Sequence, residues 1–170
     1  MKAFWISFFI VGIDLISKSL AFTYLPKAIF TVYPYGGFPV FKNFLGIQFS
    51  LNYVANKGAI GGLFADFQEY LLGFRLLLIS ALIIYLIFFH TDKKLRIPLA
   101  LIVGGAIGNI IDYFLYGHVV DMLHFVLWGY DYPVFNIADS AITVGIAWIF
   151  IHSLLSNASN SKSSRKVNLL

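Results

Sequence analysis

The sequence lacks cysteine and carries little charge. Because it has no cysteine, disulfide bonds, thiolate metal ligands and a cysteine nucleophile are excluded. Charged residues make up 12% of the chain, whereas soluble domains contain about 25%. Hydrophobic residues make up 59% and aromatic residues 18%, and this composition predicts a membrane protein. The net charge is +4, but the basic residues form no stripe with interleaved aromatics, so we expect no nucleic-acid partner.

Four apolar segments are long enough to cross a bilayer, which takes about 20 residues per helix. They cover about residues 4–24, 70–89, 97–116 and 137–155. The first resembles a signal peptide, but Asp14 and Lys18 interrupt it and no small-residue cleavage site follows, so we expect it to be retained as a helix. We therefore expect one integral membrane domain over residues 1–156 and a disordered polar tail over residues 157–170.

Basic residues are unevenly distributed between the two ends of these helices. Seven lie at one end and three at the other. Because cytoplasmic loops are enriched in Lys and Arg, we expect both termini and the turn at residues 91–96 in the cytoplasm. Residues 26–66 and 117–135 then lie outside. The seven are Lys2, Lys93, Lys94, Arg96, Lys162, Arg165 and Lys166, and the three are Lys27, Lys42 and Lys57.

The first outer segment contains a strand pattern. In GIQFSLNYV, residues 46–54, large apolar side chains alternate with mostly polar ones, and this period of two predicts a strand with one buried face. The preceding YPYGGFP, residues 33–39, is a cluster of turn residues. The predicted fold is therefore an all-α membrane bundle of four transmembrane helices with a small extracytoplasmic β-sheet within about residues 26–66.

Three aspartates from different segments are expected at one depth. With a rise of about 1.5 Å per residue, Asp112 lies in the outer part of the third helix, and Asp121 follows just after that helix. Asp139 lies in the first turn of the fourth helix, which descends from the same side. Their convergence in the outer leaflet follows from topology alone.

Each acid also has a structural interpretation. Asp139 follows Asn136 at the spacing of a helix-capping box, and Asp121 fits a solvated loop. Asp112 fits a residue that bonds to backbone and holds a helix join. Asp14 and Lys18 are four residues apart on one helix face, which predicts an ion pair, although such a pair inside a membrane also indicates a functional site.

Two carboxylates in contact share one proton, because both cannot ionise cheaply. The ionised member deprotonates a water molecule, and the protonated member polarises a carbonyl and later protonates the leaving amine. This is aspartic-protease chemistry, which requires neither metal nor cofactor. An alternative is a metal site made of His118, Asp121 and His124, whose spacing of three places them on one face if this interfacial loop is helical.

The chain resembles the bacterial type II, or lipoprotein, signal peptidase family. Four motifs carry the resemblance and occur in the family's order. They are DLISKSL from Asp14, NYVANKGAIGGLF around Asn56 to Ala59, GGAIGNIIDYFLYGHVVD from Gly104 to Asp121, and FNIADSAI around Asn136 to Asp139.

The resemblance implies four transmembrane helices and an extracytoplasmic sheet, with Asp121 and Asp139 as the catalytic dyad near the outer leaflet of the bacterial inner membrane. It implies cleavage of diacylglyceryl-modified prolipoproteins before the lipidated cysteine, beside membrane lipid. We expect a monomer without cofactor or metal. The residues implied to support or line the site are Asp14, Lys18, Asn56, Gly58, Asn109, Asp112 and Asn136.

Two positions depart from the family pattern. Tyr113 stands where the family has arginine after Asp112, and Gly61 stands where it has an aromatic residue. Arg75 or Lys57 is the candidate replacement for the missing guanidinium. Two further functions stay open: a small ion- or proton-coupled carrier that uses Asp14 and Lys18, and an inactive scaffold derived from the peptidase.

Overall fold

The computed structural model describes residues 2–29, 37–59, 62–88 and 92–167. Within these ranges lie four helices that are long and apolar enough to cross a membrane, which confirms the predicted bundle. They are α1 (Lys2–Tyr24), α2 (Gln68–Phe88), α3 (Arg96–Tyr116) and α4 (Ile137–Val167). Short 3-10 turns, η2 (Ala65–Phe67) and η3 (Lys93–Leu95), precede α2 and α3.

The fourth helix is longer than predicted. It continues to Val167, past the expected end at residue 155 and through most of the segment expected to be a disordered tail. Residues 146–167 contain neither Gly nor Pro, the two residues least compatible with a helix interior. The apolar span Ile137–Ser156 agrees with the predicted membrane segment, and the helix continues beyond it. The division of the chain into one domain stays a prediction.

A four-stranded antiparallel sheet has the order β1-β2-β3-β4. Its strands are β1 (Phe38–Phe44), β2 (Ile47–Asn56), β3 (Val119–Leu127) and β4 (Tyr130–Asp131). The strand predicted from alternation is β2. In contrast, β3 was expected to be a loop, and that expectation was wrong. Residues 119–122 are all buried, so β3 shows no alternation of apolar and polar side chains that would have revealed it.

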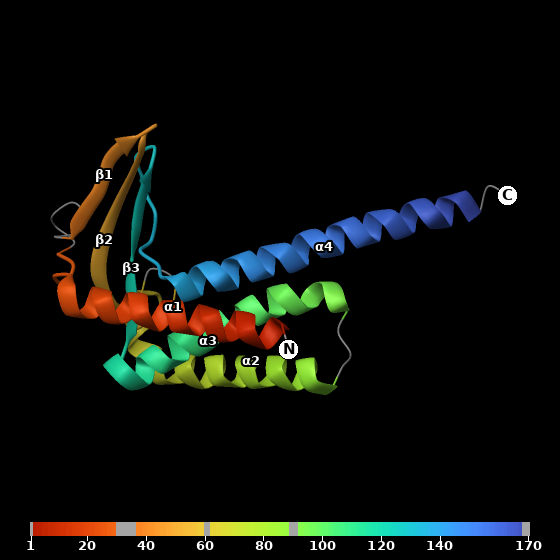
Figure 1. Ribbon diagram of the computed structural model, residues 1–170, viewed down its shortest axis with the longest axis horizontal. Helices are drawn as coiled ribbons and strands as arrows, with labels where there is room; N and C mark the ends of the chain where they lie inside the picture. Colours follow the sequence, from red (N-terminus) through yellow and green to blue (C-terminus); the bar gives the residue numbers. More distant parts are fainter. Residues whose placement is uncertain (1, 30–36, 60–61, 89–91, 168–170) are drawn as a thin grey trace.

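The sheet lies at one end of the helices, with its long strands running across the helix direction (Figure 1). The beginnings of α2 and α4 lie at the same end. The beginning of α1, η3 and the final turns of α4 lie at the other end. This is the grouping of segments that the charge distribution predicted, although which end is cytoplasmic stays a prediction. Residues 33–36 of the predicted turn cluster are outside the described residues.

Helix α3 is central and packs against α1, α2 and α4. Glycines allow close approach: a Cβ at Gly105 would collide with the Ala138 carbonyl of α4, and one at Gly108 with the Asp14 carboxylate of α1. Such small residues let membrane helices come into backbone contact. The packing brings polar residues of three helices together beneath the start of β3.

Candidate active site

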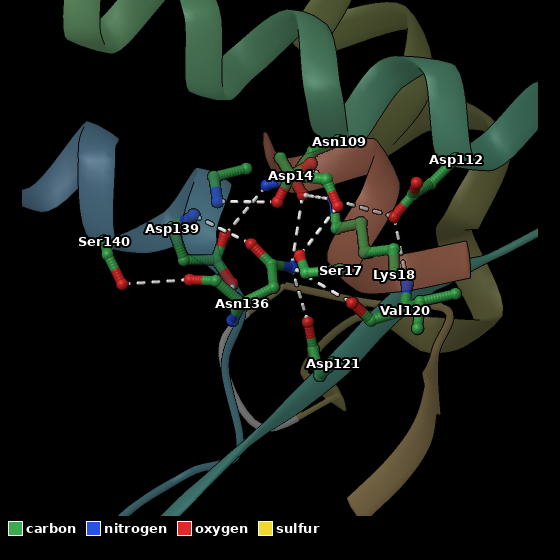
Figure 2. A network of polar contacts seen from close by, with 11 residues as sticks. Asp14, Ser17, Lys18, Asn109, Asp112, Val120, Asp121, Asn136, Asp139 and Ser140 are labelled. Carbon is green, nitrogen blue, oxygen red and sulfur yellow. Dashed lines mark hydrogen bonds and ion pairs between the residues drawn. The ribbon is translucent and has the colours of Figure 1, made fainter. Parts of the chain in front are cut away.

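Asp121 and Asp139 are joined by the side chain of Asn136. Asp121 is the third residue of β3, and Asp139 is the third residue of α4. The Asn136 amide Nδ2 donates to Asp121 Oδ1 at 2.7 Å, and Asp139 N donates to Asn136 Oδ1 at 2.8 Å (Figure 2). Asp139 Oδ2 accepts in return from Asn136 N at 3.3 Å. The predicted capping box is therefore present, and its asparagine also contacts the second carboxylate.

Asn109, on α3, provides a second link to Asp139. Its Nδ2 donates to Asp139 Oδ1 at 2.8 Å. Its Oδ1 accepts from Lys18 Nζ at 2.8 Å and from Asn136 Nδ2 at 3.2 Å. Because an amide donates at one end and accepts at the other, Asn109 connects the carboxylate to a buried cation.

Asn56, at the end of β2, approaches the other side of Asp121. Its Nδ2 donates to Asp121 Oδ2 at 2.9 Å, and its Oδ1 accepts from Gly58 N at 2.9 Å. A Cβ at Gly58 would collide with the Leu63 carbonyl, so this tight segment requires glycine. Of the sequence-predicted residues, Asn56 thus contacts Asp121 directly, and Gly58 holds the Asn56 side chain.

Lys18 lies between two aspartates beneath this network. Its Nζ is 2.6 Å from Asp14 Oδ2 and 2.8 Å from Asp112 Oδ2, and all three side chains are fully buried. Asp14 Oδ1 accepts from Ala138 N at 2.8 Å, and Asp112 Oδ2 accepts from Val120 N at 3.1 Å. The predicted Asp14–Lys18 ion pair and the predicted bond from Asp112 to backbone are both confirmed.

The environment of Asp121 favours a retained proton. Burial is the main cause that raises the pKa of Asp121 from its ordinary value of 3.8 to about 7, and the charge of Asp139 adds to the increase. Hydrogen bonds from Asn56 and Asn136 act in the opposite direction. Since burial and a like charge both disfavour ionisation, the pair can hold one proton near neutral pH.

The two carboxylates open onto an apolar cavity of about 670 Å³. Its polar end contains Asn56, Asn109, Asp121, Asp139 and Arg75. Its walls come from β3, α4 and the segment between β4 and α4, and they include Val119, Phe125, Leu127, Pro133, Phe135, Ile142 and Val144. A pocket with apolar walls and a few convergent polar groups is the usual form of a ligand site.

The histidine metal site predicted as an alternative does not form. In a strand, residues three apart point to opposite faces, so Asp121 is separated from His124 on β3. His118 Nε2 lies 2.8 Å from Tyr53 Oη, and His124 Nε2 lies 2.6 Å from Asp131 Oδ1. Within the residues that the structure describes, no three His, Cys, Asp or Glu side chains are grouped as metal ligands.

The cation paired with Asp112 is neither of the two candidate replacements for the missing arginine. Lys18 pairs with Asp112, whereas Arg75 Nη2 donates to the Gly58 carbonyl at 2.8 Å and lines the cavity. In the sequence, Arg75 stands out as a single cation in an apolar run, but its partner is visible only in the structure. Gly61 lies outside the described residues.

Comparison with known proteins covers nearly the whole membrane core. The family model for "Signal peptidase (SPase) II" matches residues 6–155. A lipoprotein signal peptidase of Desulforapulum autotrophicum is 35% identical over 158 residues, which cover 89% of this chain and 90% of that protein. One of Clostridium acetobutylicum is 42% identical over 120 residues, with coverages of 69% and 75%. One of Cupriavidus pinatubonensis is 41% identical over 110 residues, which span 62% of each protein.

Two solved structures share the fold. Both are described as bacterial membrane enzymes determined by the in meso method. The first has a TM-score of 0.77 and 28% sequence identity, and covers 94% of this chain and 90% of that chain. The second has a TM-score of 0.73 and 27% identity, with coverages of 90% and 92%. These similarities extend to the four helices and the small sheet together.

Proposed function

Since this chain belongs to the signal peptidase (SPase) II family and is therefore a multi-pass membrane protease, we propose that it removes signal peptides from bacterial prolipoproteins. The proposed substrate carries a diacylglyceryl group on a cysteine, and the bond broken is the one before that cysteine. Relatives of this chain in bacteria are named lipoprotein signal peptidases. The proposed location is the inner membrane, with both termini in the cytoplasm and the site near the outer leaflet.

One observation carries the proposed chemistry: the carboxylates of Asp121 and Asp139 both accept hydrogen bonds from Asn136 and both line one apolar cavity. Asp121, with a pKa of about 7, is suited to hold the proton that the pair shares. A pair of carboxylates in these two protonation states provides a general acid and a general base. We therefore assign the catalytic roles to Asp121 and Asp139.

The reaction follows from these two states. The ionised carboxylate takes a proton from a water molecule, and the water oxygen forms a bond to the scissile carbonyl carbon. The protonated carboxyl donates a hydrogen bond to the carbonyl oxygen and so stabilises its developing charge. The tetrahedral intermediate then breaks its C–N bond as the nitrogen receives a proton from the pair. No step requires a metal or a cofactor.

The other residues of the network have supporting roles in this proposal. Asn56, Asn109 and Asn136 hold the two carboxylates by hydrogen bonds. Asp14, Lys18 and Asp112 hold the surrounding elements together through the buried charge cluster. The proposed working unit is a monomer.

The carrier and scaffold alternatives have less support. A carrier that uses Asp14 and Lys18 needs them to meet a transported ion, yet both side chains are fully buried and Lys18 also pairs with Asp112. An inactive scaffold was considered because Tyr113 replaces an arginine. Asp112 has its own cation and a backbone donor in this chain, so Tyr113 does not leave that acid unsupported.

Incubation of the purified protein with two forms of one precursor tests the proposal. One form carries a diacylglyceryl group on its cysteine, and the other is unmodified. We expect mass spectrometry to show release of the signal peptide from the modified form alone, at the bond before the cysteine. If folded protein leaves the modified precursor intact, or cuts it elsewhere, the proposed function is wrong.

A further inference from the structure

Arg75 is a cation inside an apolar helix. It lies seven residues after the start of α2 (Gln68–Phe88), which is about 10 Å along the helix axis at 1.5 Å per residue. It is the one charged residue of α2 beyond the first turn. A charge at this depth is costly, and such residues usually mark a binding or transport function. The position of Arg75 therefore indicates that its charge has a functional role.

The described residues accept few hydrogen bonds from the Arg75 guanidinium. Among the described residues its one hydrogen bond is from Nη2 to the Gly58 carbonyl at 2.8 Å, and it has no carboxylate partner. A guanidinium presents five N–H donors in a fixed plane. Arg75 also lines the cavity that contains both catalytic aspartates. Unused donors are thus available at the wall of this cavity.

Three hydrogen bonds in series connect Arg75 to Asp121. It binds the Gly58 carbonyl, Gly58 N donates to Asn56 Oδ1 at 2.9 Å, and Asn56 Nδ2 donates to Asp121 Oδ2 at 2.9 Å. The cation therefore lies at the polar end of the cavity, close to the place where the scissile bond must reach Asp121. Arg75 and Asp121 line the same cavity, so a substrate that reaches Asp121 also meets this cation.

We propose that Arg75 binds the ester carbonyl oxygens of the diacylglyceryl group and so determines specificity for the lipidated precursor. This inference rests on the proposed function. In that substrate the glyceryl carbons are joined to the cysteine sulfur, so only the cysteine side chain and the glyceryl carbons separate the two ester groups from the scissile amide. Ester carbonyls are neutral acceptors of the same kind as the Gly58 carbonyl, which Arg75 already binds. The remaining lipid is apolar and matches the cavity walls.

A pair of synthetic precursors separates lipid recognition from structural support. Both carry the same peptide and the same chain lengths, but one has ester-linked acyl chains and the other has ether-linked alkyl chains, which lack carbonyl oxygens. Hydrogen bonds to charged groups contribute about 1.5–3 kcal/mol, which corresponds to about 10-fold to 150-fold in affinity. We therefore expect the wild-type protein to prefer the diester by about 10-fold or more in kcat/KM, mainly through KM.

Arg75→Met should lower kcat/KM for the diester by about 10-fold or more relative to kcat/KM for the diether, so that the preference disappears. Arg75→Lys keeps the charge but loses the planar fork, and it should retain part of the preference. Lys42→Met removes an exposed cation of β1 and is the matched control, for which the preference should stay at the wild-type value.

Three outcomes would overturn the inference. Equal loss on both substrates in Arg75→Met and Arg75→Lys would show that Arg75 only holds the Gly58 segment. A wild-type protein that cleaves diester and diether equally would show that the carbonyls are not recognised. Both results leave the proposed function intact. If the folded wild-type protein cleaves neither substrate, the proposed function itself fails and the inference fails with it.

Discussion

At the scale of single residues, the site depends on asparagine amides. Asn136 and Asn109 each donate to a carboxylate through nitrogen and accept from a second donor through oxygen. An aspartate in either place would bring a further negative charge close to the dyad. An alanine would leave carboxylate oxygens without donors, which is costly for buried groups. The two amides therefore orient the acids without changing the charge of the site.

The dyad itself gives the first prediction. Asp121→Asn and Asp139→Asn should each reduce cleavage by a factor of about 10² to 10⁴, because general acid–base catalysis contributes this much. The double variant should be little worse than either single variant, since the pair acts as a unit. Signal peptide release by each purified variant measures the effect. A single variant with near-normal turnover would contradict the assignment of these two residues.

The raised pKa of Asp121 predicts how stability depends on pH. Its pKa is about 7 in the folded protein and ordinarily 3.8, so the folded state binds more protons between about pH 4 and pH 7. The stabilisation from this proton is fully present below about pH 4 and is lost as the pH rises through about 7. Each unit of difference between the two pKa values corresponds to at most about 1.4 kcal/mol in the free energy of unfolding. Asp121→Asn removes this dependence.

Thermal unfolding in detergent across this pH range measures the difference. The unfolding midpoint of the wild-type protein should fall more between about pH 4.5 and about pH 7.5 than that of Asp121→Asn, because only the wild-type protein has this proton to lose. Parallel curves for the two proteins would show that burial of Asp121 does not raise its pKa.

At the scale of helices and strands, one buried charge cluster connects the elements that carry the site. Lys18 of α1 pairs with Asp14 of the same helix and with Asp112 of α3. The two acids in turn accept from the backbone N–H groups of Ala138 in α4 and Val120 in β3. The starts of β3 and α4 are therefore positioned by the same three side chains, and each start is adjacent to a member of the dyad.

Lys18→Met should be strongly destabilising, since it leaves two buried acids without their cation. Breaking a buried ion pair in this way costs about 3–5 kcal/mol. Combining Lys18→Met with Asp14→Asn and Asp112→Asn removes all three charges and should recover much of that loss. Unfolding midpoints in detergent measure both effects, with Lys42→Met as the exposed control. A Lys18→Met protein as stable as this control would contradict the role given to the cluster.

At the scale of the whole molecule, the sheet and the helix bundle each contribute residues to the site. The helices supply Asp139, Asn109 and the charge cluster, and the sheet supplies Asp121 and Asn56. The strands lie across one end of the helices (Figure 1), so the dyad forms where a strand meets a helix. In the proposed function, a substrate held by its lipid in the bilayer presents its scissile bond at this junction.

Cysteine labelling tests the orientation of the molecule in the membrane. The native sequence has no cysteine, so single cysteines at Lys42 and Lys94, both exposed, report without background. Lys94 belongs to the group of seven basic residues and Lys42 to the group of three, and the larger group is expected in the cytoplasm. A membrane-impermeant reagent applied to spheroplasts should therefore label position 42. Position 94 should react only after the membrane is broken. Labelling of both from one side would contradict the proposed topology.

The sequence by itself determined the membrane class, the four spans, the strand β2 and the Asp14–Lys18 ion pair. These features are local: hydropathy over about 20 residues, a period of two and a spacing of four on a helix are each set by neighbouring residues. The motifs also named the polar residues of the site. They did so through the resemblance to the signal peptidase II family and not through any local physical pattern.

The tertiary structure decided which polar groups meet. Nothing local in the sequence shows that Lys18 contacts Asn109, 91 residues away, or that Arg75 contacts the carbonyl of Gly58. Nor does it show that residues 119–127 form a strand, because both faces of its first half are covered by other elements. Such contacts depend on how helices pack and on which strand pairs with which. The packing determines which partners a buried polar side chain has. Leaving such a group without a partner in an apolar interior costs more free energy than local conformational preferences contribute.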